Sequence, residues 1–467
     1  MPTRLARYRR EIAATLLLAG PIVLTQVAHI SLSFVDTIMV GRLGPESLAG
    51  IALGNTVYFT LIIMAMGIVM AVGPMVSQAF GAGEEDPIGR SVRQGLWLAL
   101  CLAVVVMIVY SNAEALLLAA GQAPENAALA ASYLGAIKWS AFPFLAFVAL
   151  RSFVEGVSRP RAVTAIAFIG VGMNVFANWT LMYGHLGFPA MGLVGTGWAS
   201  TVVHWMDFAL LAAFVATRPE FGGYQIFGRL RRPDPHYFRQ LFKIGWPIGA
   251  SFGIETMLFM VTLFMMGWIS TTSLAAHQVA IQCAAFTFMV PLGIGLASSV
   301  RVGQAAGRRD PAGARRAGYA GMGLSVAFMA AAAVLFWTAP RFVIGIYLDL
   351  SDPANREVIE VAVVLLSVAA IFQVADGLQV SAAGALRGFK DTTVPMLIAA
   401  FSYLGVGLAT GYLLGFKLEL GGRGLWWGLV TGLAMAAVLL VTRFRKLSDS
   451  AVAMPDISEE NALETPA

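Results

Sequence analysis

Charged residues are scarce in this sequence. Asp, Glu, Lys and Arg make up 12% of its 467 residues, whereas hydrophobic residues make up 58% and the mean hydropathy is +0.75. Soluble domains carry about 25% charged residues, so no part of the chain is expected to form a soluble domain. Apolar runs of about 20 residues, each long enough to cross a bilayer core of roughly 30 Å, recur from end to end. The sequence therefore predicts an all-α polytopic membrane protein.

Cysteine is also rare, since only Cys101 and Cys283 are present and both fall in apolar runs. This excludes a disulfide framework and a cysteine-rich metal site. The chain has no HExxH, GxxxxGKS/T or DxDxDG pattern, and no nucleophile–base pair is spelled out. A membrane-embedded enzyme is therefore disfavoured, and no cofactor is expected. The pI near 9.3 reflects basic loops and does not indicate nucleic-acid binding.

Twelve membrane spans are predicted from the apolar runs. They cover residues 12–40, 47–79, 92–111, 127–155, 162–183, 191–216, 240–268, 274–303, 314–339, 357–386, 393–415 and 424–442. The longest connector divides the chain into a six-span lobe (1–216), a cytoplasmic linker loop (217–239) and a second six-span lobe (240–446). The acidic tail, 447–467, is expected to be disordered.

The distribution of basic residues predicts the orientation. With the N-terminus inside, 25 of the 31 Lys and Arg residues fall in cytoplasmic segments and 6 fall outside, as the positive-inside rule requires. Both termini are therefore expected in the cytoplasm. The basic N-terminus lacks a small-residue cleavage site, so we expect it to be retained and not removed as a signal peptide.

The two halves repeat each other at an offset of 226 residues. The offset aligns Pro21 with Pro247, Gly41 with Gly267, Gly67 with Gly293, Gln78 with Gln304 and Arg90 with Arg316. Because six helices separate the copies, both enter the membrane from the same side and are related by an axis along its normal. Transporters built from such repeats bind substrate between the halves and alternate access by rocking them. The alternative is a duplicated bundle with no transport role.

Asp36 is a carboxylate inside the first apolar run. A charge within a membrane helix costs roughly 2.5–3.5 kcal/mol on insertion scales, so such a residue is a functional candidate. The alternative is a hydrated helix end, since Arg42 follows six residues later. In the fifth span Asn174 and Asn178 share one helix face, and they serve either this carboxylate or interhelical packing.

Two further acids lie in the second half. Glu255 and Asp376 are twelve residues from Lys243 and eleven from Arg387, so both are about 16–18 Å from the cytoplasmic face. At one depth they could share a proton or a cation. From spacing alone, two separate hydrogen-bonded acids in a wet cavity are equally compatible.

Several other polar residues have simpler interpretations. His204 and Asp207 are a turn apart in the sixth span and are predicted to satisfy each other without a transport role. His29 and His277 are expected to face the central cleft or a helix contact and not a metal. Some of the many Met and Phe side chains are expected to line an adaptable apolar cleft.

The chain resembles the multidrug and toxic compound extrusion (MATE) transporters, and among them the NorM-like branch. The resemblance rests on FVDTIMVGRLGPESLAG at 34–50 and AAHQVAIQCAAFTFMVPLGIGLASSVRVGQAAG at 275–307, and it extends over about 12–445. It implies twelve helices in two lobes and export of organic cations against a gradient of Na⁺ or H⁺. The implied partners are small cationic substrates and the lipid bilayer, with no nucleic acid and no obligate protein partner. The implied location is the bacterial inner membrane.

The resemblance also implies site residues. Glu255 and Asp376 match the acids that handle the coupling cation, with a possible Na⁺ site between them. Asp36 matches the first-lobe acid, and Asn174, Asn178 and Thr196 match its polar neighbours. Whether Asp36 couples protons or acts as a substrate counter-ion is left open, with coupling favoured. Phe372 stands where some relatives have Tyr, which puts a hydroxyl ligand from that position in doubt.

The alternative within the same superfamily is a lipid-linked oligosaccharide flippase. It would have a strongly basic central cleft for a pyrophosphate headgroup, and two extra spans. Here twelve spans are predicted and the charges expected inside the membrane are acids.

Overall fold

The computed structural model describes residues 4–43 and 45–453, which form helices and connecting loops with no β-strand among them. Twelve helical segments in this part are long and apolar enough to cross a membrane, which confirms the all-α, twelve-span architecture. The helices are α1 (Arg4–Gly41), α2 (Pro45–Val69), α3 (Val72–Ala82), α4 (Glu85–Ser111), α5 (Ala113–Ala119), α6 (Pro124–Ile137), η1 (Lys138–Ser140), α7 (Ala141–Gly156), α8 (Arg161–Leu181), α9 (Gly192–Thr217), η2 (Pro219–Tyr224), α10 (Pro235–Ile269), α11 (Thr271–Gly307), α12 (Pro311–Thr338), α13 (Pro340–Ile344), η3 (Pro353–Asn355), α14 (Arg356–Gly388), α15 (Thr393–Ala399), η4 (Ala400–Gly407), α16 (Leu408–Tyr412), η5 (Leu413–Lys417) and α17 (Gly421–Ala453).

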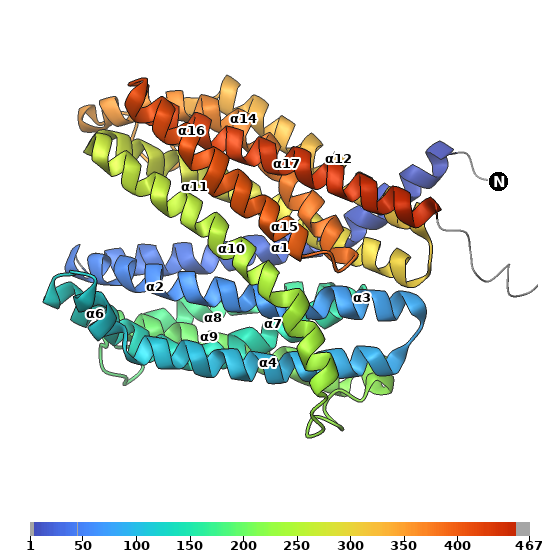
Figure 1. The fold of residues 1–467 in the computed structure, drawn as a ribbon. Coiled ribbons are helices and arrows are strands. Elements are labelled where there is room, and N and C mark those ends of the chain that lie inside the picture. The colour runs from blue at the N-terminus through green and yellow to red at the C-terminus, as the bar shows by residue number, and fades with distance from the viewer. Residues whose placement is uncertain (1–3, 44, 454–467) are drawn as a thin grey trace, which may run out of the picture.

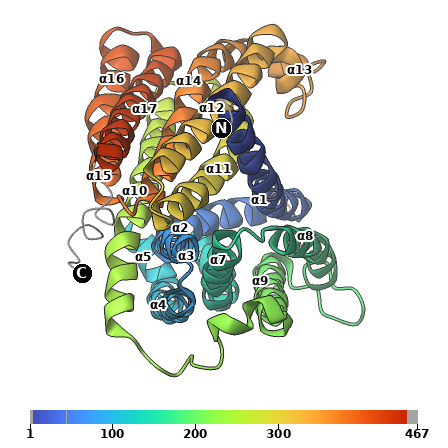
Figure 2. The same ribbon diagram turned by 90° about the vertical axis from the view of Figure 1, so that its right-hand side faces the viewer.

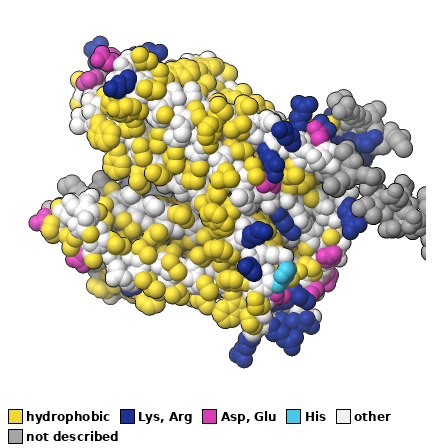
Figure 3. Space-filling view, in the orientation of Figure 1, with side chains coloured by type: hydrophobic (Ala, Val, Ile, Leu, Met, Phe, Trp, Pro, Cys, Tyr) yellow, Lys and Arg dark blue, Asp and Glu magenta, His cyan; other side chains and the backbone are white. Residues whose placement is uncertain are grey.

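The helices form two bundles that lie one above the other (Figure 1). The first contains α1 to α9 and has its own core, in which Leu145 and Phe153 are fully buried. The second contains α10 to α17 around Leu366 and Trp426. Large apolar side chains such as Trp205 remain exposed on the outer surface, and hydrophobic residues cover most of the visible face (Figure 3). Helices that are apolar towards both the core and the outside are typical of membrane bundles.

The first helix of each repeat packs against the opposite lobe. The helix α1 lies along α11 of the second lobe as well as along α8 of its own, and α10 lies along α2 of the first lobe. Figure 2 shows α1 reaching from the first lobe to α11 and α12. Where α2 and α10 cross, the backbones touch, because a Cβ added to Gly67 would lie 2.6 Å from the Gly249 Cα. Each lobe is thus held by a helix of the other.

Hydrogen bonds across the lobe interface lie at the end where most Lys and Arg side chains gather, called the basic end here (Figure 3). The Gln78 Nε2 donates to the Gly388 carbonyl at 2.8 Å, and Gln304 Nε2 donates to the Gly156 carbonyl at 2.9 Å and to Ser158 Oγ at 2.8 Å. Gln78 and Gln304 are related by the sequence repeat. The two lobes therefore close on each other at the basic end, whereas they splay apart at the opposite end (Figures 1 and 3).

The predicted cytoplasmic linker is anchored to α4 at the basic end. Arg93 Nη1 donates to the Gln225 carbonyl at 3.1 Å, and Trp97 Nε1 donates to the Leu230 carbonyl at 3.0 Å. At the end of this linker, Asp234 caps α10 by accepting bonds from the backbone amides of residues 236 and 237. Hydrogen bonds thus hold the linker against α4.

The disorder predicted from residue 447 onward is wrong for the first part of the tail. Residues 447–453 continue α17, where Asp449 pairs with Arg315 at 2.7 Å and with Arg445 at 3.7 Å. Ion pairs to the helix and to its neighbour offset the polar composition there. Residues 454–467 lie outside the described part of the chain.

The position of the linker gives a test of orientation. In a chain whose two cysteines are replaced by alanine, we expect Gln225→Cys to react with a membrane-impermeant maleimide in inverted vesicles only. Glu419→Cys is a matched control, because it is also an exposed loop residue with positive φ, between the last two spans. It is expected to react on intact cells only. Labelling of Gln225→Cys on intact cells would contradict the predicted orientation.

Candidate functional site

Asp36 lies at the centre of a polar cluster formed by three helices of the first lobe. Its Oδ1 accepts hydrogen bonds from the Asn178 Nδ2 at 2.6 Å and from the Asn174 Nδ2 at 3.0 Å, both on α8. Its Oδ2 accepts a bond from the Ser200 Oγ on α9 at 3.3 Å. All three donors are buried. The structure therefore brings together the carboxylate and both asparagines that the sequence singled out, and an ionised Asp36 has the donors it needs.

The hydroxyl in this cluster belongs to Ser200 and not to Thr196. Thr196 is fully buried one turn earlier on α9, and its Oγ1 has no hydrogen-bond partner among the described residues. Positions 196 and 200 share a helix face, so the sequence identified the correct face but not the correct turn. The spacing i, i+4 was the available signal.

Two contacts fix α1 beside α8, so that these residues meet. The Tyr183 hydroxyl, just after α8, donates to the Met39 carbonyl at 2.8 Å. Further along, the Pro21 carbonyl accepts bonds from Thr25 Oγ1 at 3.0 Å and from Thr164 Oγ1 at 2.7 Å. Pro21 lacks an amide donor and weakens the α1 ladder at this point. The Thr164 hydroxyl of α8 thus contacts α1 at its only internal proline.

The cluster opens onto a cavity of about 360 Å³ in the first lobe. Its polar lining includes Asp36, Asn174, Ser200, His204 and Asp207. The remaining wall is mostly aromatic and aliphatic, with Tyr58, Phe59, Phe144, Phe147, Met66 and Leu292. The cavity thus combines acidic side chains with a mostly apolar wall.

Glu255 and Asp376 occupy neighbouring positions in the second lobe. Glu255, on α10, faces the cavity between the lobes, whereas Asp376, on α14, is buried and does not line it. Asp376 Oδ1 accepts a bond from the Gln379 Nε2 at 3.3 Å. The two carboxylates are close enough for their charges to interact, but no direct hydrogen bond joins them among the described residues. The structure thus brings this pair together as neighbours.

A hydroxyl near this pair comes from Tyr403. It lies in η4, a π-helical segment, and lines a small cavity with Glu255, Gln379 and Arg387. Single turns of π-helix are frequent at functional sites because they turn side chains out of α-helical register. Phe372 instead packs on Trp426 with ring centroids 5.6 Å apart. Tyr403 was not identified from the sequence, because π-helical register is not visible in apolar periodicity.

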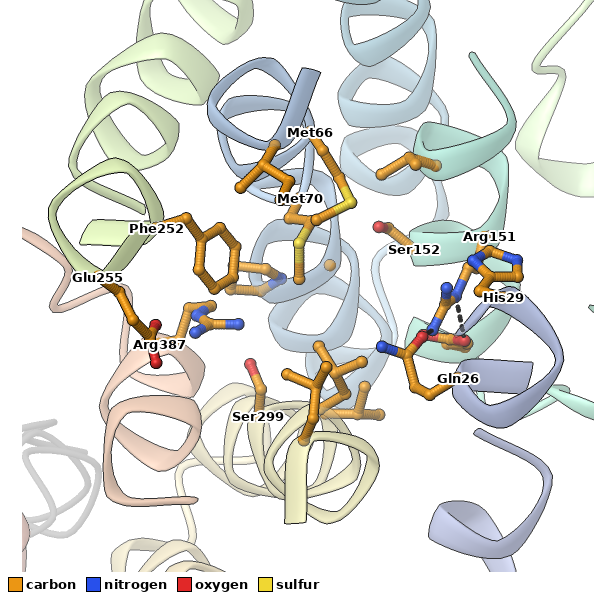
Figure 4. A pocket seen from close by; sticks show the side chains of 18 of the residues that line it. Gln26, His29, Met66, Met70, Arg151, Ser152, Phe252, Glu255, Ser299 and Arg387 are labelled. Atoms are coloured by element: carbon orange, nitrogen blue, oxygen red, sulfur yellow. Dashed lines mark hydrogen bonds and ion pairs between the residues drawn. The ribbon is translucent and has the colours of Figure 1, made fainter. Parts of the chain in front are cut away.

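The cavity between the lobes has a volume of about 310 Å³ and carries charges from both repeats. In Figure 4, Glu255, Phe252 and Arg387 lie on one side and Gln26, His29 and Arg151 on the other. The repeat offset relates Gln26 to Phe252 and His29 to Glu255. The repeat therefore places different chemistry at equivalent positions of the two lobes.

Each arginine of this cavity has a partner in its own lobe. The Arg151 Nε forms an ion pair with Glu155 at 2.7 Å, and its Nη2 donates to the Gln26 Oε1 at 2.6 Å (Figure 4). The Arg387 guanidinium lies 5.8 Å from the centre of the Phe252 ring and interacts with Glu255. The expectation that charges inside the membrane are acids is therefore incomplete. The i, i+4 pair of Arg151 and Glu155 within an apolar run was a usable signal.

Comparison with known proteins identifies the family. The MatE family model matches residues 21–180 and 247–413, which are the two halves of the repeat. The chain belongs to the MatE family.

Its relatives in this family include proteins described as "Probable multidrug resistance protein NorM". The one from Brucella suis biovar 1 (strain 1330) is 42% identical over 442 residues, covering 94% of each chain. The one from Mesorhizobium japonicum is 43% identical over 439 residues, again covering 94% of each chain. Among solved structures, a MATE protein crystallised in a straight conformation superimposes with a TM-score of 0.87 over 95% of this chain and 97% of that one, at 19% identity. Members of this family are transporters and not enzymes.

Within this MatE-family chain, the predicted pair of His204 and Asp207 is wrong. No hydrogen bond joins them, and Asp207 Oδ1 has no partner among the described residues. His204 instead packs edge-on against Phe144, with ring centroids 5.1 Å apart. The positions are three residues apart on α9, but the aromatic contact turns the imidazole away.

The other two histidines are placed as expected. His29 lines both the first-lobe cavity and the cavity between the lobes. His277 is buried in a helix contact, edge-on against Trp426 at a centroid distance of 5.7 Å. Neither belongs to a group of three or more potential metal ligands within the described ranges.

The two hydroxyls of α9 provide a matched pair for testing the Asp36 cluster. We expect Ser200→Ala to lower the unfolding temperature of the purified protein at neutral pH, because a bond to an ionised carboxylate contributes about 1.5–3 kcal/mol. Thr196→Val, which removes a hydroxyl without a partner, should leave the temperature unchanged or raise it. The deficit of Ser200→Ala should shrink on acidification, since a neutral carboxyl accepts weaker bonds. Equal unfolding temperatures for the two variants would contradict the assigned contact.

Proposed function

We propose that this chain is a cation-coupled antiporter that exports amphipathic organic cations, with Na⁺ or H⁺ as the coupling ion. The observation that carries the proposal is that carboxylates of both lobes, Asp36 in the first and Glu255 in the second, line cavities beside and between the lobes. The closed basic end and the splayed opposite end are compatible with one state of alternating access. The family relatives, named for multidrug resistance, support export of varied compounds.

The lining of the cavity between the lobes suits an amphipathic cation. Met66, Met70, Phe252, Phe259 and Phe288 supply apolar surface, and Glu255 supplies a negative charge. Thioethers repack around ligands of different shape, and aromatic faces attract cations. A broad range of flat or bulky cations is the substrate class that such a wall favours.

We assign the coupling role to acids in both lobes. In the first lobe, ionised Asp36 holds α1 to α8 and α9 through three donors. Protonation removes the charge and weakens these bonds. The helix α1 can then shift at Pro21, where its ladder is interrupted, and because α1 also packs on α11, the shift reaches the second lobe.

In the second lobe, Glu255 and Asp376 are the candidates for binding a proton or Na⁺. Two neighbouring carboxylates in a low-dielectric site repel each other when both are ionised. A proton or a cation bound between them relieves this repulsion. The side-chain amide of Gln379 and the Tyr403 hydroxyl lie nearby, and each has a neutral oxygen atom that can serve as a ligand to a cation. Hard cations such as Na⁺ prefer oxygen ligands of this kind.

A flippase for lipid-linked oligosaccharides is the second candidate, and the charges in the cavity argue against it. Arg151 and Arg387 are each balanced by a glutamate, so the cavity between the lobes is not strongly basic. A pyrophosphate headgroup would require an excess of positive charge.

We further propose that the protein spans the bacterial inner membrane with both termini in the cytoplasm. The concentration of Lys and Arg at one end of the molecule supports this orientation.

The proposal is tested by neutralising each acid. Glu255→Gln and Asp376→Asn are expected to abolish ethidium efflux from energised cells while expression stays near that of the parent chain, because an amide has no negative charge for a proton or Na⁺ to neutralise. Asp36→Asn should still bind ethidium but no longer release it when the outside is acidified. Full efflux by both second-lobe variants would refute their role. Loss of binding in Asp36→Asn, with ion-driven conformational change intact, would make Asp36 the counter-ion instead.

A further inference from the structure

Asp207 is a buried carboxylate without a partner. It lies on α9 and lines the first-lobe cavity, and its side chain is 4% exposed. It makes no hydrogen bond and no ion pair with any residue in the described ranges, and its Oδ1 is completely enclosed. A buried carboxylate that is not satisfied is costly. The carboxylate is therefore available to pair with a positive group that enters the cavity.

The contrast with Asp36 shows which acid is available to a ligand. The oxygens of Asp36 already accept bonds from Asn174, Asn178 and Ser200. Asp207 is two turns further along the same helix as Ser200, about 10 Å away along the helix axis. The first-lobe cavity therefore has one carboxylate with a hydrogen-bond donor on each oxygen and a second with none among the described residues.

Gly170 provides the space that the Asp207 carboxylate occupies. It lies on α8, opposite α9, and a Cβ at this position would be 2.9 Å from Asp207 Oδ1 and 3.0 Å from Oδ2. Real Cβ atoms are essentially never found that close to another heavy atom, so any larger residue would displace the carboxylate. The site is thus built by two helices.

The walls around Asp207 define the kind of ligand. His204 packs edge-on against Phe144, and both line the same cavity as Asp207, with Phe147, Met66 and Leu292 as further apolar lining. No Lys or Arg lines this cavity within the described residues. A negative charge facing an aromatic and aliphatic space matches a single positive charge on a bulky apolar body.

We propose that Asp207 is the counter-ion that holds the positive group of an amphipathic organic cation in the first-lobe cavity. The inference rests on the proposed export function and deepens it, because it separates substrate binding at Asp207 from ion coupling at Asp36. Cation and carboxylate pair directly, and the apolar body lies against the wall shared by Phe144 and Met66. The cavity shares Gln26, His29, Met66 and Leu292 with the cavity between the lobes, so the two are adjacent.

The test measures equilibrium binding to the full chain in lipid nanodiscs. The probes are tetraphenylphosphonium, whose charge is permanent, and uncharged triphenylphosphine oxide of similar aromatic bulk. The parent chain should prefer the cation. Asp207→Asn should bind the cation at least about tenfold more weakly, which corresponds to 1.4 kcal/mol, while its affinity for the uncharged probe stays the same.

The glycines of α8 give a matched control that leaves the carboxylate in place. Gly170→Ala should weaken cation binding, because the new Cβ would displace the Asp207 carboxylate from its present position. Gly172→Ala, on the same helix with nothing within 4 Å of its Cβ, should bind as the parent does. This pair keeps the proposal testable if Asp207→Asn does not fold.

Three outcomes are distinguishable. Equal cation binding by the parent, Asp207→Asn and Gly170→Ala would overturn the counter-ion assignment alone and leave the export function standing. Equal loss of both probes in Asp207→Asn would also overturn it, because the residue would then be structural. Failure of the parent chain to bind the cation would count against the assignment and the export function together.

Discussion

Ionisable side chains inside a membrane bundle need partners, and this constraint explains much of the arrangement seen here. Free charges in that environment are expensive, and the cost falls when donors, counter-charges or ligands surround them. Asp36 has three donors, Arg151 has Glu155 and Gln26, and Arg387 interacts with Glu255. These contacts join α1 to α8 and α9, α1 to α7, and α10 to α14. The charged side chains of the two cavities thus also tie together helices of the two bundles, including the α1 and α10 that pack across the lobe interface.

The two copies of the sequence repeat share contacts that join the lobes, but they differ in the residues that line the cavity between the lobes. The repeated Gln78 and Gln304 each bond to a backbone carbonyl of the opposite lobe and close the basic end. At equivalent positions, however, the first lobe has Gln26 and His29, whereas the second has Phe252 and Glu255. The repeat thus gives the two lobes a common scaffold but different polar side chains at the cavity between them.

The large features were predictable because they depend on composition and periodicity. Span number, the parallel repeat and the clustering of Asp36 with Asn174 and Asn178 follow from apolar runs, from the offset of 226 and from equal depth. Contacts that depend on rotation of a helix about its axis did not follow. Ser200 and not Thr196 reaches Asp36, and Tyr403, which lines the second-lobe cavity, lies in the π-helical segment η4.

The other predictions that were wrong concern side chains that contact different partners from those expected. His204 and Asp207 are spaced to meet, yet the imidazole packs on Phe144 and the carboxylate sits over Gly170. Arg151 and Arg387 are assigned to cytoplasmic segments by charge counting, but both line the cavity between the lobes. There Arg151 pairs with Glu155 and Arg387 interacts with Glu255. Tail residues 447–453 are helical because Asp449 pairs with two arginines.

Coupling of organic-cation export to an ion gradient can be measured directly with the purified chain. The purified parent chain is reconstituted in proteoliposomes loaded with tetraphenylphosphonium, and its release is followed under an imposed Na⁺ gradient and, separately, under an imposed pH gradient. If export is coupled to an ion gradient, at least one inward cation gradient drives release of the organic cation beyond that of liposomes without protein. Release that is the same under both gradients and with no gradient would contradict it.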